Sequence, residues 1–132
     1  MASPMDIAAS AMHAQMMRLN TVASNLANAE TLSSSAADAY RSKQVVFSEL
    51  LDNQRNNAGV AVSQVVESNA EIPKRYEPGH PLADENGYVY GSNVNTAEEM
   101  ANMISASRAF QSNAEVYSTT KTLMLRTLQL GN

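Results

Sequence analysis

Apolar residues recur at alternating spacings of four and three near the start of the chain. This first apolar stripe consists of Met5, Ala9, Met12, Met16, Leu19, Ala23 and Leu26. Such spacing keeps side chains on one face of an α-helix. Ser3 stands where an N-cap is wanted, Pro4 suits the first helical position, and Asp6 adds an acid at the third. The pattern therefore predicts a long helix with one apolar face.

A second apolar stripe repeats every seven residues near the end of the chain. Met103, Phe110, Tyr117 and Met124 form its centre, Ala109, Val116, Leu123 and Leu130 flank it, and Ser105, Ser112, Thr119 and Arg126 mark the opposite side. Asn95 can cap this helix, and Glu98 can reach back to the Asn95 amide. Glu99 complements the helix dipole, and Gly131 suits a left-handed C-terminal position. We expect a helix over residues 97–130.

A helix over residues 97–130 is roughly 50 Å long at about 1.5 Å per residue. Globular helices average about 11 to 12 residues, and a pattern beyond about 25 indicates a coiled coil, a membrane span or a repeat. Arg108, Glu115 and Lys121 exclude a membrane span. We therefore predict a mainly α fold in which the N- and C-terminal long helices form a coiled coil. Two such stripes are more apolar surface than a monomer of this size easily buries, which points to assembly.

The segment between the helices has a different character. Residues 31–39 form a Ser/Ala loop, and Lys43–Asp52 fits a short helix or a strand, of which we favour the helix. Gly59–Glu67 is rich in valine and reads as a strand. Asn86-Gly87 is a tight-turn signal directly before a short strand at Tyr88–Tyr90. The chain thus divides into an N-terminal helix (1–31), a loop with a small β-containing insertion (32–94) and a C-terminal coiled-coil helix (95–132).

Composition narrows the functional classes. The formal net charge is −4, with nine Lys plus Arg and no Trp, so the basic footprint of a nucleic-acid binder is missing. The absence of cysteine removes disulfides, thiol catalysis and cysteine-ligated metals, and suits a chain that enters an oxidising compartment. No basic stretch followed by an apolar one opens the chain, so we expect any export to proceed without a cleaved signal peptide.

Residues that could carry chemistry have simpler interpretations. His13 and His80 have no second histidine or acid at helical ligand spacing. The stretch Asp84–Gly87 superficially resembles a calcium loop but lacks the further acids, so a turn is favoured. Glu98 and Glu99 point about 100° apart on a helix and cannot share a substrate. We expect no enzyme activity, no cofactor, no metal site and no small-molecule substrate.

Charge is sparse on the first helix. Between Met1 and Glu30 only Asp6, Arg18 and Glu30 are charged; the positions off the stripe include Ser10, His13, Gln15, Asn20, Thr21, Ser24, Asn25 and Asn28. Short uncharged polar groups can be buried at small cost when they are hydrogen-bonded. Neighbouring molecules could therefore cover more than one face, although an antiparallel helix pair with a bland surface is the alternative. In a lone hairpin of helices, Ser24, Ser105 and Ser112 should be solvent-exposed.

Two segments resemble a known family. Leu19-Asn20-Thr21-Val22-Ala23-Ser24-Asn25-Leu26-Ala27-Asn28-Ala29-Glu30-Thr31 resembles the N-terminal signature of bacterial flagellar rod and hook proteins. Residues 95–111, from Asn95-Thr96-Ala97-Glu98-Glu99 to Arg108-Ala109-Phe110-Gln111, resemble the partner helix of that family. Gly79-His80-Pro81-Leu82-Ala83-Asp84, Gly87-Tyr88-Val89-Tyr90 and Asn93-Val94-Asn95 are similar to proximal-rod proteins of the FlgC type.

The resemblance implies a structural subunit of the flagellar basal body. Such a subunit is exported by the flagellar type III apparatus and polymerises through its terminal helices into the proximal rod, the periplasmic drive shaft for motility. Implied partners are the other proximal and distal rod subunits, the rod-to-ring adaptor and the export apparatus. Phe47 and Leu51 form an aromatic-x-x-x-aliphatic pair that looks like the export-gate motif of these subunits, although both could simply pack in the core. A free-standing helical adaptor that binds a single partner is the alternative function.

The resemblance and the two stripes together name the residues expected at the assembly surface. They are Met5, Met12, Met16, Leu19, Leu26, Met103, Phe110, Tyr117, Leu123, Met124 and Leu130.

Overall fold

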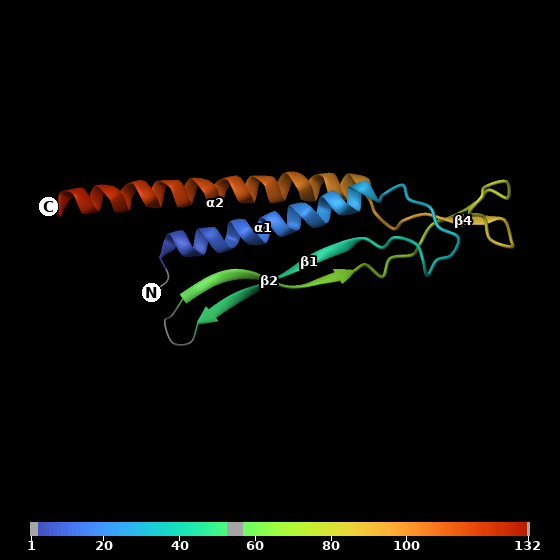
Figure 1. Ribbon diagram of the computed structural model, residues 1–132, viewed down its shortest axis with the longest axis horizontal. Helices are drawn as coiled ribbons and strands as arrows, with labels where there is room; N and C mark the ends of the chain where they lie inside the picture. Colours follow the sequence, from blue (N-terminus) through green and yellow to red (C-terminus); the bar gives the residue numbers. More distant parts are fainter. Residues whose placement is uncertain (1–2, 53–56, 132) are drawn as a thin grey trace. The chain divides into compact units, whose positions relative to one another are not determined.

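The computed structural model contains two long helices, and a β-containing segment lies between them along the chain (Figure 1). The structure describes residues 3–52 and 57–131, with the side chains of 50–52, 57 and 58 excepted. The elements in chain order are α1 (Pro4–Ala27), β1 (Lys43–Asp52), β2 (Asn57–Glu67), β3 (Lys74–Tyr76), β4 (Tyr88–Tyr90) and α2 (Thr96–Leu130). The expected layout of two long helices around a small β insertion is thus confirmed.

The helix starts follow the capping residues that the sequence offers. The backbone N–H of Asp6 donates to Ser3 Oγ at 3.2 Å, and the Ser3 N–H donates back to Asp6 Oδ2 at 3.4 Å. At the start of α2, the Glu98 N–H donates to Asn95 Oδ1 at 3.2 Å. These bonds satisfy amide groups that have no partner within a helix, which explains why α1 and α2 begin where they do.

The segment Lys43–Asp52 is a strand, so the preference for a short helix was wrong. It forms a two-stranded sheet with β2, and the Ser63 hydroxyl donates to the Val46 carbonyl at 3.1 Å. Val45, Val46 and Phe47 are β-branched or aromatic residues that suit a pleated surface. An apolar run this short is ambiguous by periodicity, and the pairing with β2 decides it.

The β3–β4 hairpin confirms the expected turn and strand. Its register pairs Lys74 with Tyr90, Arg75 with Val89 and Tyr76 with Tyr88. Gly87 has φ of 85°, and a Cβ there would lie 2.9 Å from Tyr76 Cε2. Glycine is therefore the residue that fits this turn. The side chain of Val89, in β4, is fully buried.

The chain forms two compact units, and each long helix contributes to both. Unit 1 is drawn from Met1–Leu19, Val45–Gln64 and Ile104–Asn132; unit 2 is drawn from Asn20–Gln44 and Val65–Met103. The buried apolar side chains of unit 1 are Ala8, Ala14 and Ala106, and those of unit 2 are Val22, Ile72 and Val89. Asn25, Ser42, Ser92 and Glu99, the buried polar residues, all belong to unit 2. No helix in the described part of the chain is long and apolar enough to cross a membrane.

Candidate assembly site

The first apolar stripe is only partly covered in the single chain. Met5, Met12, Leu19 and Leu26 are half-buried, whereas Met16 is 44% exposed. The most deeply buried positions of α1 are instead Ala8, Ala14, Val22 and Asn25. Three of these four precede a stripe residue by one position, and one residue is about 100° around a helix. The face that α1 buries within the chain is therefore not centred on its methionines.

The second apolar stripe becomes progressively uncovered along α2. Met103, Phe110 and Tyr117 are half-buried, but Leu123 and Met124 are 56% and 47% exposed, and Leu130 is 87% exposed. Every residue from 121 to 130 is exposed, including Leu125 and Leu128. Large apolar side chains are therefore left exposed at this end of α2, which is typical of a surface that binds another molecule.

The three serines singled out from the sequence do not share one environment. Ser105 and Ser112 are exposed on α2, as expected for a single chain. Ser24 is half-buried, and its hydroxyl lies 3.1 Å from the hydroxyl of Tyr40. The expectation that Ser24 is exposed was therefore wrong, because the segment that follows α1 folds back over it.

Asn25 is the centre of a hydrogen-bond network in unit 2, which we call the polar junction. The network consists of Ser24, Asn25, Tyr40, Ser42, Lys43, Asn93 and Glu99. Asn25 Nδ2 donates to the Lys43 carbonyl at 2.7 Å and to Glu99 Oε2 at 3.1 Å. Asn25 Oδ1 accepts from the Tyr40 hydroxyl at 2.9 Å and from the Lys43 N–H at 3.0 Å. Both ends of this fully buried amide are thus satisfied, as a buried polar group requires.

Glu99 brings a carboxylate into the polar junction with a side chain only 3% exposed. It lies in the first turn of α2, where the helix dipole favours a negative charge. The Asn25 amide bonded to it comes from 74 positions earlier in the chain, so this bond ties the end of α1 to the start of α2. The assignment of Glu99 to the helix dipole alone was therefore incomplete.

Asn93 extends the polar junction toward β2 and β3. Its Oδ1 accepts from the Ser42 N–H at 2.6 Å, and its Nδ2 donates to the carbonyls of Ser68 at 3.3 Å and Ala70 at 3.1 Å. Arg41 donates to the same two carbonyls at 3.1 and 3.2 Å. These bonds join the segment before β1, the segment between β2 and β3, and the segment before α2.

The polar junction has the features of a structural hydrogen-bond network rather than of a catalytic site. Its one carboxylate is buried against an amide, and its hydroxyls already lie in hydrogen bonds. Over the described residues, no three of His, Asp or Glu come close enough to hold a metal ion. What the arrangement does is fix the relative position of α1, the start of β1 and α2 within unit 2.

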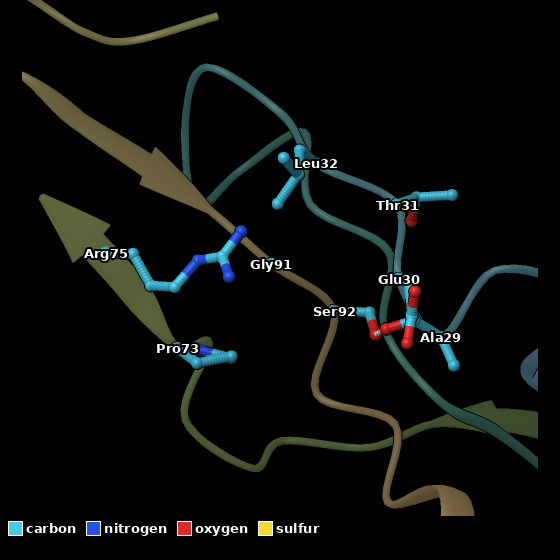
Figure 2. A pocket seen from close by; sticks show the side chains of 8 residues that line it. All are labelled: Ala29, Glu30, Thr31, Leu32, Pro73, Arg75, Gly91 and Ser92. Carbon is cyan, nitrogen blue, oxygen red and sulfur yellow. Dashed lines mark hydrogen bonds between the residues drawn. The ribbon is translucent and has the colours of Figure 1, made fainter. Parts of the chain in front are cut away.

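A surface hollow of about 360 Å³ opens in unit 2 (Figure 2). Glu30 and Arg75 line it together with Ala29, Thr31, Leu32, Pro73, Gly91 and Ser92. The Ser92 hydroxyl donates to the Ala29 carbonyl at 2.6 Å and holds one wall in place. With one acidic and one basic side chain, the hollow carries no net charge that would select an ionic ligand.

Asp84 organises the tip of the β3–β4 hairpin. Its Oδ1 accepts from the N–H groups of Asn86 and Tyr88, each at 2.9 Å, and its Oδ2 accepts from the Tyr90 hydroxyl at 3.0 Å. The Tyr88 amide bond is the main cause that lowers the pKa of the Asp84 carboxyl, with the Tyr90 hydroxyl adding to it. The same contact with Asp84 raises the pKa of Tyr90. The carboxylate oxygens are thus committed to a turn, as the sequence favoured over a calcium loop.

The two residues of the suggested export motif lie in β1. Phe47 is 37% exposed, and the side chain of Leu51 lies outside the described residues. Their use in export stays a prediction.

The pairing of Asn25 with Glu99 is what sequence reasoning missed. Both residues lie in the segments that carry the family resemblance, and burial of short polar groups such as Asn25 was expected, but by neighbouring molecules. No periodicity relates residues 74 positions apart. The available signal was the scarcity of charge on α1, which is also compatible with burial of its polar face by the chain itself.

Comparison with known proteins matches both ends and nearly the whole length of the chain. A family model described as flagella basal body rod protein matches residues 5–31, and one described as flagellar basal body rod FlgEFG protein C-terminal matches residues 85–130. The flagellar basal-body rod protein FlgC of Salmonella typhimurium is 51% identical over 126 residues, which cover 96% of this chain and 94% of that protein. The FlgC proteins of Yersinia enterocolitica and Aquifex aeolicus are 48% and 39% identical, over 96% and 95% of this chain and 94% and 92% of their own lengths.

Proposed function

The chain belongs to the FlgC family of flagellar basal-body rod proteins, and from this premise we propose that it is a structural subunit of the proximal rod. The observation that carries the proposal is identity of 39–51% over nearly the whole chain to proteins of that one name. The family is one of structural rod components, so the subunit acts by assembling and transmitting torque.

The terminal helices are the proposed means of assembly. We infer that α1 and α2 form a coiled coil within each subunit, with 1–31 and 95–132 as the terminal segments that carry these helices and 32–94 as the insertion. The exposed end of α2 supports this role, because Leu123, Met124 and Leu130 are 56%, 47% and 87% exposed in the single chain. Neighbouring subunits would bury these side chains, each worth roughly 1.5–3 kcal/mol when fully removed from water.

The proposed partners are other proximal and distal rod subunits, the rod-to-ring adaptor and the flagellar type III export apparatus. The proposed location is the rod within the periplasm. Phe47 on β1 is 37% exposed, which is compatible with its recognition by the export gate. We expect the strands around Phe47 to fold only after export. The proposed partners and location are supported by the family and by the exposed apolar surface of α2.

Deletion of the gene in its host, followed by electron microscopy of purified basal bodies, tests the proposal. We expect basal bodies without a completed rod and cells that do not swim, with both defects reversed when the gene is restored. Intact rods in the deletion strain would overturn the rod assignment and favour the free-standing adaptor that binds a single partner.

Export is tested separately with the double variant Phe47→Ala and Leu51→Ala. The expected result is a soluble protein that stays in the cytoplasm, because the gate no longer recognises the aromatic-x-x-x-aliphatic pair. Val45→Ala, on the same strand, is the matched control and should be exported. Normal secretion of the double variant would show that the pair has only a packing role.

A further inference from the structure

Asn86-Gly87 is the one place in the chain where glycine follows asparagine. Such a pair is prone to deamidation in an unfolded chain, because glycine has no Cβ to shield its backbone nitrogen from the neighbouring carboxamide. The nitrogen of Gly87 attacks Cγ of Asn86 and forms a cyclic imide. The side-chain nitrogen of Asn86 leaves as ammonia and takes up the proton of the Gly87 N–H. Water then opens the imide at either carbonyl and gives aspartate or isoaspartate.

The folded turn engages the Gly87 nitrogen in a hydrogen bond. The Gly87 N–H donates to the Asp84 carbonyl at 3.0 Å, and the Gly87 carbonyl accepts from the Glu77 N–H at 2.9 Å. The N–H groups of Asn86 and Tyr88, on either side, donate to Asp84 Oδ1, each at 2.9 Å. Gly87 is buried, whereas Asn86 is exposed to water. Cyclisation removes the Gly87 proton and moves the nitrogen to Cγ, so these bonds must open before Asn86 can react.

The same turn prevents removal of the reactive pair through a change of its glycine. Gly87 has φ of 85°, where other residues are strained. A Cβ at this position would lie 2.9 Å from Tyr76 Cε2 and 3.1 Å from Pro78 Cβ. The hairpin therefore requires the glycine that makes the preceding asparagine reactive.

We propose that Asn86 is a deamidation site whose reactivity is controlled by the β3–β4 hairpin: it reacts in the unfolded chain and is protected once the Asp84 hydrogen bonds have formed. Isoaspartate is the more damaging product, because the main chain then runs through Cβ and gains one atom. That atom lengthens the loop that Asp84 closes onto Tyr88, so a chain modified before folding forms this hairpin poorly. Folding of the hairpin thus protects the covalent structure of its own turn.

Peptide mapping by mass spectrometry tests this protection in the full chain. The protein would be incubated at neutral pH in guanidinium chloride or in native buffer, with sodium chloride added to the native sample to match the ionic strength. We expect Asn86 to convert at least about tenfold more slowly in the native sample, which corresponds to an opening free energy of about 1.4 kcal/mol. Asn20 and Asn113, which do not precede glycine, should convert more slowly than Asn86 in denaturant. Equal rates at Asn86 in the two samples would overturn the proposal.

Two substitutions of Asp84 separate its hydrogen bonds from its charge. Asp84→Ala removes the acceptor of the Asn86 and Tyr88 N–H groups, so native deamidation of Asn86 should accelerate toward the rate in denaturant. Asp84→Asn is the matched control, because it removes the same charge and keeps an oxygen that can accept both bonds; Asn86 should stay protected. An alanine variant as slow as the wild type would overturn the proposal. Equally fast reaction of both variants would also overturn it, since the protection would then come from the charge.

Discussion

The two ends of helix α2 differ in what the single chain provides for them. At the start, Asn95 caps the helix and Asn25 binds the buried carboxylate of Glu99 at 3.1 Å. At the end, every residue from 121 to 130 is exposed, and Leu130 is 87% exposed. One end of the helix is thus completed by its own chain, while the other presents apolar surface that needs a neighbour.

Two amide side chains of helix α1, Asn25 and Gln15, also differ in whether the chain supplies their hydrogen-bond partners. Asn25, in unit 2, is fully buried and satisfied at both its nitrogen and its oxygen. Gln15, in unit 1, has a buried Oε1 with no hydrogen-bond partner in the described part of the chain. Buried polar groups are almost always paired in folded proteins, so the buried amide of unit 2 is satisfied, whereas unit 1 keeps one buried oxygen that the described residues do not pair.

Of the changes that test this difference between the two units, loss of the Asn25 amide should have the largest effect on stability. Asn25→Ala leaves the Glu99 carboxylate buried without its donor, and we expect unit 2 to lose about 3 kcal/mol or more of stability. Tyrosine fluorescence during urea unfolding reports on unit 2, because Tyr40, Tyr76 and Tyr90 lie there with Tyr88.

The control for this variant is Asn20→Ala, at an exposed position of the same helix. It should change stability by no more than about 0.5 kcal/mol. An Asn25→Ala protein that unfolds at the same urea concentration as the control would mean that the polar junction does not hold unit 2 together.

The second-largest effect should come from Ser112→Glu, which we expect to block assembly without destabilising the single chain. Ser112 is exposed, so Ser112→Glu should leave solubility, export and stability of the monomer unchanged. In the rod the added carboxylate would be desolvated without a partner, at a cost of several kcal/mol per interface. We expect incomplete rods and loss of swimming, whereas Ser112→Ala should swim. Swimming of the glutamate variant would show that this face stays open to water.

The long helices and their caps follow from local rules, which is why the sequence predicts them well. Ser3, Pro4 and Asn95 act within one helical turn, and the Asn86-Gly87 turn needs only a positive φ at Gly87. The strand at Lys43–Asp52 was mistaken for a helix because an apolar run this short is ambiguous by periodicity, and its pairing with β2 decides the conformation.

The polar junction lies beyond local rules altogether. Its decisive bond joins Asn25 and Glu99 across 74 positions, and each residue taken alone has an adequate local explanation. The exposed Ser105 and Ser112 of α2 and the half-buried Ser24 look alike in sequence, and they differ because the hydroxyl of Tyr40 lies against Ser24. Polar residues of this kind reveal their role only when the fold brings their partners to them.

A smaller effect should follow from replacing the amide that lacks a partner. Gln15→Met keeps the length of the side chain and removes the unsatisfied oxygen, so we expect the helices of unit 1 to gain about 1 kcal/mol in stability. Thermal unfolding followed by far-UV circular dichroism, which reports on secondary structure, would show a higher midpoint. A lower midpoint would indicate that the Gln15 oxygen has a partner in solution.

The smallest effect concerns acid and the tip of the β3–β4 hairpin. Hydrogen bonds from the Tyr88 amide and the Tyr90 hydroxyl lower the pKa of the Asp84 carboxyl below its ordinary value of 3.8. The folded hairpin therefore favours the carboxylate, so this contribution to stability is complete above the ordinary pKa and is lost as pH falls through the lower, folded one. Amide chemical shifts of Asn86 and Tyr88, followed by NMR during acidification, should report the loss.

Asp84→Asn separates the carboxyl from the rest of the turn. The asparagine oxygen can still accept from the amides of Asn86 and Tyr88, but it does not titrate in this range. Its hairpin should form at neutral pH and show no transition at the pH where the wild-type shifts move. Because Asp84 belongs to unit 2, the transition should leave the exposed end of α2 unaffected, whereas one shared by residues 121–130 would mean that hairpin and helix end are coupled in solution.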